Sequence, residues 1–431
     1  MTSNGGRVPK DPCSKAEASL ETSPHSPSGG VVPMAFLLLV VSFSFVRYLH
    51  DVAKLLLESS FIDFAHYYTY AVVVRLGQNP FDPQAVSQVD ALLAIRRAGS
   101  AANYPPLFYL LMQPWVLVPF RGAVILWLFA SQAYLFGALT LCVRRFGPPS
   151  AVGVAALLFV SLNYQPLMEN LALGQVNLVL LFLVTLAWWG LRAGRPWVAA
   201  ASVALCPFIK VQFGLLLLLL WWMGQSRILG RALLLIAVGL GLGAILLGPA
   251  HHAAYVRCVI AASGSILSWT ANLSLAATAH RVLGVFGQEW RLADLLTLAA
   301  DGVLLAALGR TIPRSAPSAS PALDWAWALG VTAIPLLSPL TEEHHLVILL
   351  FPLSLLLLNF SEGRNSSADM LLLLVIVLLL GSRYSLERFP VFSHGVLALL
   401  ATGKLFGTAC LAWLLVRMVR KTDADFGGVS A

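Results

Sequence analysis

Long apolar runs separated by short polar stretches dominate the chain. A helix needs about 20 residues to cross about 30 Å of hydrocarbon, and many of the runs reach or approach that length. In chain order, the runs that we interpret as spanning or partly spanning helices are 32–49, 107–120, 126–143, 151–167, 176–191, 196–223, 229–248, 291–309, 323–339, 346–360, 367–381 and 395–418. The pattern predicts an all-α polytopic membrane protein with about 10–12 transmembrane helices.

Two of these runs are unusual. Run 107–120 is short and contains Pro114, which predicts a partial or re-entrant element. Run 196–223 carries Pro207 and Lys210 near its middle, so two short helices meeting at Lys210 are expected. If this run crosses the membrane twice, both ends of the chain lie on the same side.

Composition supports a membrane protein and excludes a water-soluble domain. Of the 431 residues, 58% are hydrophobic and 11% are charged, whereas soluble domains carry about 25% charged residues. The net charge of +8 comes from basic residues scattered between apolar runs. This distribution is typical of topology determinants and headgroup contacts, and it argues against nucleic-acid binding. The five cysteines lie far apart without a CxxC pair, so neither a disulfide framework nor a zinc site is indicated.

The chain divides into one long membrane domain and two tails. Residues 1–31 are rich in Ser, Pro and Gly and predict a disordered tail, 32–420 form the membrane domain, and 421–431 form a short second tail. The first apolar run has no small-residue cleavage site after it, which favours an anchor over a removed signal peptide. Clusters of Arg and Lys place both tails on the cytoplasmic side.

The same partition puts most polar residues on the outer face. The segments that fall there are 50–104, 165–175, 249–290, 338–345 and 382–394. Because they carry most of the side chains capable of chemistry, a site on that face is expected.

Asp63 is the strongest catalytic candidate. It lies in the stretch 59–83, just after the first apolar run, among several aromatic residues. Helical spacing puts Asp63, Tyr67 and Tyr70 on one face, which suits an amphipathic helix lying in the membrane interface. A carboxylate there can act as the general base that deprotonates a sugar hydroxyl. The alternatives are a solvated acid at a helix end and tyrosines that anchor the helix in lipid.

The run Glu342-Glu343-His344-His345 places four ionisable residues at the edge of an apolar segment. Hydrogen bonding to a phosphate or a sugar is the favoured interpretation, and a solvated loop is the alternative. Adjacent histidines point apart on a helix and no third ligand follows from the spacing, which argues against metal binding. The segments assigned to the outer face also contain no tight Asp-x-Asp pair, so no required metal is expected.

Three further polar residues have two interpretations each. Lys210 could reach the outer face and neutralise a lipid phosphate, or it could snorkel from one long helix. Gln175 and Asn177, at the start of an apolar run, could bind sugar hydroxyls, or could cap and pack the helix.

Several stretches, taken in order, resemble one known family. They are DFAHYY (63–68), GQNPFDP (77–83), NYPPLFYLL (103–111), GQVNLVLLFL (174–183), the run 194–222 and SPLTEEHHLVILLFPLSLLL (338–357). Together they resemble glycosyltransferase family 87, a group of integral membrane enzymes that use polyprenyl-phosphate sugars. The chain departs from the family pattern at Phe81, where Tyr is commoner, and at Thr341-Glu342, where Trp or a similar residue is commoner. These departures concern the identity of the sugar or the acceptor.

The resemblance implies a GT-C-like bundle with interfacial helices in the first outer loop, and a specific reaction. That reaction is inverting transfer of a hexose, by family default mannose, from a polyprenyl-phosphate carrier to a hydroxyl of a glycolipid, glycan or protein. It would take place among membrane lipids at the outer face of the plasma membrane, without a cofactor. Asp63 is carried over as the base, and Lys210, His344 and His345 are the expected phosphate-binding residues. The expected sugar- and lipid-binding residues are His66, Tyr67, Tyr68, Tyr104, Gln175, Asn177, Trp269, Asn272 and Glu343.

The competing interpretation is a multi-spanning transporter or lipid flippase for a glycolipid or a lipid-linked sugar. Such proteins commonly contain internal repeats with matched broken helices. The chain has no second copy of the DFAHYY stretch or of the Pro207/Lys210 break, which favours the enzyme. A polymer-forming ligase of the same architecture stays open.

Overall fold

The computed structural model describes residues 28–95, 104–144, 150–267, 269–284, 290–314, 320–362, 365–383, 386 and 389–427, and these residues form helices and no strand. The helices before the bundle centre are α1 (Ser28–Glu58), α2 (Ile62–Arg75), α3 (Pro83–Leu93), α4 (Pro106–Leu111), η1 (Trp115–Leu117), α5 (Phe120–Arg144), α6 (Ala151–Leu162), α7 (Gln165–Leu173) and α8 (Asn177–Arg192). They are followed by α9 (Pro196–Ile209), η2 (Val211–Gly214), α10 (Leu215–Trp222), α11 (Ser226–Leu247), α12 (Pro249–Leu267), α13 (Leu275–Leu283) and α14 (Trp290–Thr311). The last are α15 (Pro321–Leu337), η4 (Glu343–Leu349), α16 (Leu350–Phe360), α17 (Ser367–Gly381), η6 (Pro390–Phe392), η7 (Val396–Thr402) and α18 (Gly403–Gly427).

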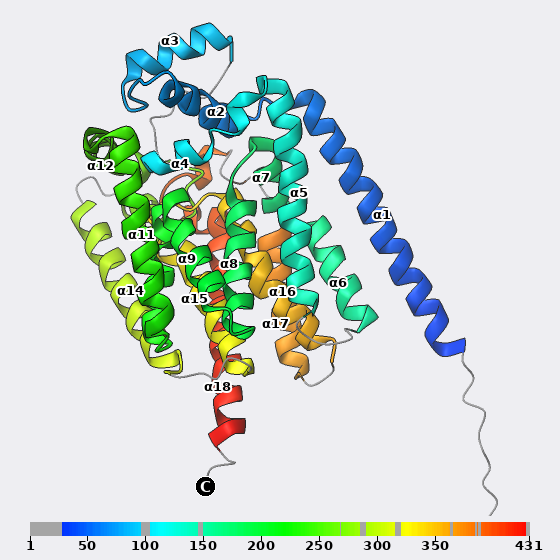
Figure 1. Cartoon of the computed structure of the whole chain (residues 1–431). Coiled ribbons are helices and arrows are strands. Elements are labelled where there is room, and N and C mark those ends of the chain that lie inside the picture. Colours follow the sequence, from blue (N-terminus) through cyan, green and yellow to red (C-terminus); the bar gives the residue numbers. More distant parts are fainter. Residues whose placement is uncertain are drawn as a thin grey trace, which may run out of the picture.

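The helices form a bundle that is capped at one end. In Figure 1, α2 and α3 lie across the upper end with α4 just below them, while the first turn of α1 and the end of α18 lie at the opposite end. In the described part of the chain, six helices are long and apolar enough to cross a membrane, or seven if the pair α6 and α7, bent by 47°, is one span. Five shorter apolar helices lie among them. The structure therefore confirms an all-α polytopic membrane protein.

The two irregular runs fold as their prolines predict. Run 107–120 forms the six-residue α4 and the three-residue η1, with Pro114 between them. In run 196–223, α9 ends at Ile209 and Lys210 has an extended backbone with φ −139° and ψ 117° before the chain turns into η2 and α10. The predicted meeting of two short helices at Lys210 is confirmed.

Other boundaries differ from the sequence-based expectation. Helix α1 begins at Ser28 and α18 continues to Gly427, so parts of both predicted tails are helical; residues 1–27 and 428–431 lie outside the described residues. The predicted loop 249–290 contains α12 and α13. These helices were missed because His251, His252 and Arg257 interrupt the apolar pattern of the first, while the second has only nine residues.

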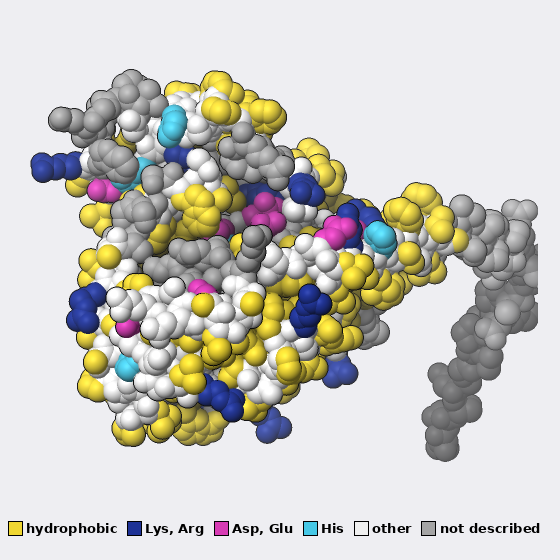
Figure 2. All heavy atoms as spheres, turned by 90° about the horizontal axis from the view of Figure 1, so that it is seen from above, with side chains coloured by type: hydrophobic (Ala, Val, Ile, Leu, Met, Phe, Trp, Pro, Cys, Tyr) yellow, Lys and Arg dark blue, Asp and Glu magenta, His cyan; other side chains and the backbone are white. Residues whose placement is uncertain are grey.

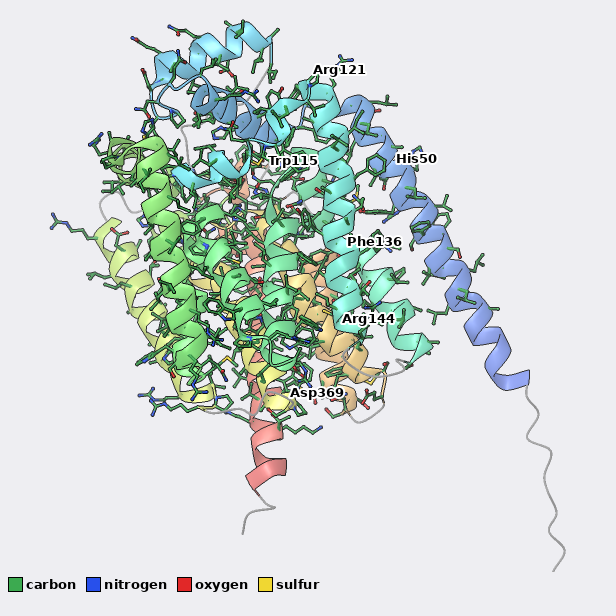
Figure 3. All side chains as sticks on the ribbon, in the orientation of Figure 1. His50, Trp115, Arg121, Phe136, Arg144 and Asp369 are labelled. Atoms are coloured by element: carbon green, nitrogen blue, oxygen red, sulfur yellow. The ribbon has the colours of Figure 1, made fainter. Side chains whose placement is uncertain are left out.

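An ion pair inside the bundle joins two of its helices. The Arg192 guanidinium lies 2.6 Å from a carboxylate oxygen of Asp324, and the Trp188 indole donates to the same oxygen at 2.9 Å, which joins α8 to α15. Figure 3 places Arg144 and Asp369 toward the end where α18 terminates, and Trp115 and Arg121 toward the capped end. The described cysteines Cys142, Cys206, Cys258 and Cys410 are free.

Candidate functional site

Helix α2 is fixed to the bundle by its N-terminal turn. Phe61, just before the helix, has a left-handed backbone (φ 45°), which turns the chain from α1 into α2. The Phe64 side chain packs against Trp127 of α5, with ring centroids 5.2 Å apart. Nine residues of the helix are buried, so α2 lies across the capped end of the bundle with most of its residues packed against protein (Figure 1). Burial gives Asp63 a fixed position at the edge of the bundle.

Asp63 belongs to a buried polar cluster. The Gln175 side-chain amide donates to the Asp63 carboxylate at 2.8 Å. The Tyr67 hydroxyl donates to the Gln175 amide oxygen at 2.7 Å and lies 2.7 Å from the Tyr104 hydroxyl. The predicted common face of Asp63 and Tyr67 is confirmed, because both contact Gln175. Tyr70 instead stacks on His66, with ring centroids 4.1 Å apart.

Lys210 brings a buried positive charge to this cluster. Its ammonium lies 5.9 Å from the centre of the Tyr104 ring, and its charge interacts with those of Asp63 and Glu342. Burial raises the pKa of the Asp63 carboxyl, while the Gln175 hydrogen bond and the Lys210 charge act to lower it. Burial also raises the pKa of the Tyr67 phenol well above its usual value, which keeps this side chain neutral. Asp63 is therefore the group suited to accept a proton.

The first turn of η4 and the loop before it present Glu342, His344 and His345 to the same region. Asn272 holds this loop: its amide donates to Pro339 O at 2.9 Å, and its amide oxygen accepts from the Thr341 N–H at 3.0 Å. The Asn177 amide donates to the His344 carbonyl at 3.2 Å. Lys210 and His345 line one small cavity, so they converge on a common space.

The two histidines do not point apart, contrary to the expectation from sequence. Their ring centroids lie 4.5 Å apart, and candidate ligand atoms of Glu342, His344 and His345 lie within 4.8 Å of one another. His345 Nδ1, however, accepts the Glu342 backbone N–H at 3.2 Å. A neutral ring then carries its proton on Nε2, the nitrogen that faces the Glu342 carboxylate at 3.9 Å. Metal coordination needs that lone pair free, so this geometry favours hydrogen-bond donation.

Only some of the other predicted sugar-binding residues lie near Asp63. Tyr104 joins the cluster, and His66 lies beside it. The Tyr68 hydroxyl donates to Val118 O at 2.8 Å, away from Asp63, and the Trp269 side chain is exposed. Asn272 is fully buried and its amide is occupied by backbone groups, so it positions the loop instead of contacting a sugar. Gln175 and Asn177 likewise position Asp63 and His344.

One apolar cavity adjoins this cluster, and a second adjoins the first. An apolar cavity of about 260 Å³ lies between α4, α5, α8 and α9. Its lining includes Trp115, and also Val176 and Ile209, which adjoin Gln175 and Lys210 in the sequence. A second apolar cavity, of about 420 Å³, shares Phe182 with it and includes Phe136. Figure 3 shows Trp115 near the capped end and Phe136 farther along α5, so the two cavities follow the bundle wall.

A third cavity, of about 110 Å³, is polar and has Glu342 among its lining residues. We call it the acidic cavity; its lining residues are Glu169, Ala271, Leu273, Glu342, Glu343, His344, Ala401 and Lys404. Figure 2, which views the capped end, shows acidic and basic side chains together in a recess near the centre of that face. Lys404 was not predicted from the sequence, and Glu169 was recognised only as a polar residue of the outer-face segment 165–175. The sequence did contain a signal for Lys404, because it is a lone lysine inside the apolar run 395–418. A charge within an apolar run marks a candidate functional residue, as it did for Lys210.

Comparison with known proteins identifies the family. A sequence model of glycosyltransferase family 87 matches residues 103–339, more than half of the chain. The chain belongs to glycosyltransferase family 87. The family match includes Tyr104, Gln175 and Lys210, and it leaves Asp63 and Glu342 outside its bounds.

The chain is also similar to a polyprenol-phosphate-mannose-dependent alpha-(1-2)-phosphatidylinositol pentamannoside mannosyltransferase of Mycobacterium tuberculosis (strain CDC 1551 / Oshkosh). The two are 28% identical over 257 residues, which cover 57% of this chain and 56% of the relative. The matched region thus spans about half the length of the relative.

Proposed function

We propose that this family 87 protein is a hexosyltransferase of the plasma membrane that transfers mannose from a polyprenyl-phosphate carrier to a hydroxyl acceptor at the outer face, with inversion. The main support is the buried polar cluster. In it, Gln175 of the loop before α8 holds the Asp63 carboxylate of α2, and the Lys210 charge interacts with that carboxylate. A fixed base beside a buried cation suits a reaction that removes a proton and releases an anion.

The proposed reaction is a single displacement. Asp63 accepts the proton of the acceptor hydroxyl as its oxygen bonds to the anomeric carbon of the donor sugar. The bond between that carbon and the phosphate oxygen breaks, and the polyprenyl phosphate leaves with the electron pair. Attack opposite to the leaving group inverts the anomeric configuration. No proton is needed on the departing phosphate if cations and hydrogen-bond donors receive its charge.

Lys210 and His345 are the proposed phosphate-binding residues. Lys210 is buried and faces a common space with His345. The Nε2–H of His345 is a donor in the tautomer described above. A phosphate would satisfy both groups, because its oxygens accept several hydrogen bonds. His344, which was predicted with them, lines the acidic cavity instead.

The apolar cavities along α5 and α8 are the proposed place for the isoprenoid chain. They begin beside Val176 and Ile209, the neighbours of Gln175 and Lys210, and run along the bundle wall. A lipid bound there would bring its phosphate to Lys210. Mannose as the sugar and a glycolipid as acceptor are supported by the name of the mycobacterial relative.

The test is transfer by purified protein in detergent, with polyprenyl-phosphate-mannose and a lipid acceptor extract. Asp63→Asn keeps the shape of the side chain and removes the base, so we expect transfer to fall by about 10²–10⁴-fold while donor binding persists. Asp82→Asn is the matched control: Asp82 caps α3 by accepting from Gln84 N–H, and asparagine caps equally well.

Full transfer by Asp63→Asn would make Asp63 a structural residue and direct the search for the base to Glu342 and Glu343. Absence of transfer by the unmodified protein with every polyprenyl-phosphate sugar tested would refute the enzyme and favour a transporter of lipid-linked sugars.

A further inference from the structure

The acidic cavity has charges that the proposed phosphate site does not use. Glu169, Glu342 and Glu343 supply three carboxylates, and Lys404 is the basic residue among its lining side chains. Lys404 is 2% exposed, and its ammonium contacts the Glu343 carboxylate at 2.7 Å and the carbonyls of Leu380 and Ser382 at 3.0 Å each. Lys404 therefore positions Glu343. An excess of carboxylates repels a phosphate, so this cavity is unsuited to the leaving group.

Two groups in the cavity have hydrogen-bonding capacity left over. The Glu169 carboxylate makes no hydrogen bond or ion pair with a described residue. The His344 side chain is 2% exposed, and its Nε2 atom has no hydrogen-bond partner in the described part of the chain; its nearest carboxylate oxygen, on Glu342, is 3.6 Å away. A buried polar atom left unsatisfied is costly, so His344 Nε2 points to a ligand that completes its contacts, and the half-buried Glu169 carboxylate can bind the same ligand.

A sugar ring suits this combination of groups. Its hydroxyls donate to carboxylates and accept from an imidazole N–H, and it carries no charge that the acids would repel. The volume of about 110 Å³ is several times the roughly 30 Å³ that a water occupies in the liquid, so part of a ring can enter. The Glu342 and Glu343 side chains are 18% and 26% exposed, which leaves the cavity accessible.

Glu342 joins this cavity to the reaction centre. It lines the acidic cavity, and its charge interacts with those of Asp63 and Lys210 on the other side. The charge of Glu169 also interacts with that of Asp63. A ligand in the cavity is thus next to the proposed base.

We infer that the acidic cavity binds the sugar residue that accepts the transferred hexose, with Glu169 and Glu343 accepting hydrogen bonds from its hydroxyls. The inference rests on the proposed glycosyl transfer. It makes the acceptor a glycoside or glycolipid whose terminal sugar enters the cavity, and it makes Glu169 a residue that determines acceptor affinity.

The test separates acceptor binding from donor binding. Octyl α-mannoside serves as acceptor and radiolabelled polyprenyl-phosphate-mannose as donor, and KM is measured for each. For Glu169→Gln we expect the acceptor KM to rise about tenfold, the effect of weakening a hydrogen bond to a charged group, and the donor KM to stay unchanged. Glu58→Gln is the control, since Glu58 is an exposed acid at the end of α1, paired with Lys54. An unchanged acceptor KM in Glu169→Gln, or an equal rise in Glu58→Gln, overturns the inference.

A binding measurement without donor distinguishes this inference from the proposed function. Saturation-transfer NMR would report contact of methyl α-mannoside, methyl α-glucoside and myo-inositol with the unmodified protein and with Glu169→Gln. Signal that weakens in the variant supports the cavity even if no transfer is detected. Equal signals in the two proteins overturn the assignment.

Discussion

At the scale of single residues, Gln175 opposes the effect of burial on the pKa of Asp63. The Gln175 hydrogen bond lowers the pKa of the Asp63 carboxyl, and burial raises it by the larger effect. A base works only when deprotonated, so transfer should decline as the pH falls through the raised pKa of Asp63. This acidic limb lies above the value of about 3.9 that is usual for aspartate.

We expect Gln175→Met to move this acidic limb to higher pH, because it removes the interaction that lowers the pKa of Asp63. Turnover should fall about tenfold at acidic pH, the effect of losing a hydrogen bond to a charged group, and should recover partly as the pH rises. The measurement is kcat/KM against pH.

Gln113→Met is the control for this variant. The Gln113 amide donates to Ala71 O at 2.9 Å and to Tyr109 O at 3.0 Å, so it fastens the same cap without touching Asp63. A limb that moves equally in both variants would mean that the effect comes from loosening the cap.

At the scale of helices, the turn between α7 and α8 sets the distance from α2 to Gln175. Gly174 has φ +69°, and a Cβ there would lie 2.7 Å from Phe64 Cβ of α2. Gly194 has a similar φ of +60° with no atom within 4 Å of such a Cβ. A side chain at either glycine would strain the backbone, but only a side chain at Gly174 would also collide with α2.

We expect Gly174→Ala to lower both thermal stability and transfer more than Gly194→Ala does. Each alanine incurs about 1–2 kcal/mol from the left-handed backbone, and only the first also pushes α2 away from the bundle. The measurements are the unfolding midpoint in detergent and the rate of transfer. Equal losses in the two variants would show that the contact between α2 and this turn is unimportant.

Helix positions could be predicted from sequence where apolar runs were long and clean. Helix α17 has the expected bounds, and the break at Lys210 followed from a proline and a buried charge in one run. Helix α12 was missed because its polar residues break the apolar pattern, although tertiary contacts stabilise the helix. The position of Asp63 was predictable, but its link to Gln175 was not, since that contact joins residues 112 apart in sequence.

The histidine pair shows the same limit. Adjacent residues diverge on an α-helix, and they diverge by about 120° on a 3-10 helix such as η4. The ring contact therefore depends on how the side chains turn, and the capping box between Glu342 and His345 fixes the His345 ring. Nothing in the local sequence indicated this capping box. The roles of Asn177 and Asn272 were also hidden, because each holds the loop through backbone groups distant in sequence.

At the scale of the whole molecule, orientation in the membrane is the open prediction. The cap helices and the end of α18 lie at opposite ends of the bundle (Figure 1). With the five cysteines replaced by alanine, Ser87→Cys on exposed α3 should react with a membrane-impermeant maleimide on intact cells, and Arg420→Cys on α18 should react only after lysis. The opposite pattern would put the site on the cytoplasmic side.

The fastening of the cap has a consequence for kinetics. Three hydrogen bonds tie the α2–α4 region to itself and to the bundle: Tyr68 to Val118, Gln113 to Ala71 and Tyr67 to Gln175. A cap held in this way leaves the bundle wall, with its apolar cavities, as the route by which a lipid reaches Lys210. Under the proposed function, encounters then take place in two dimensions. Turnover would follow the mole fraction of donor in the bilayer, and adding inert lipid would slow the enzyme without changing the bulk donor concentration.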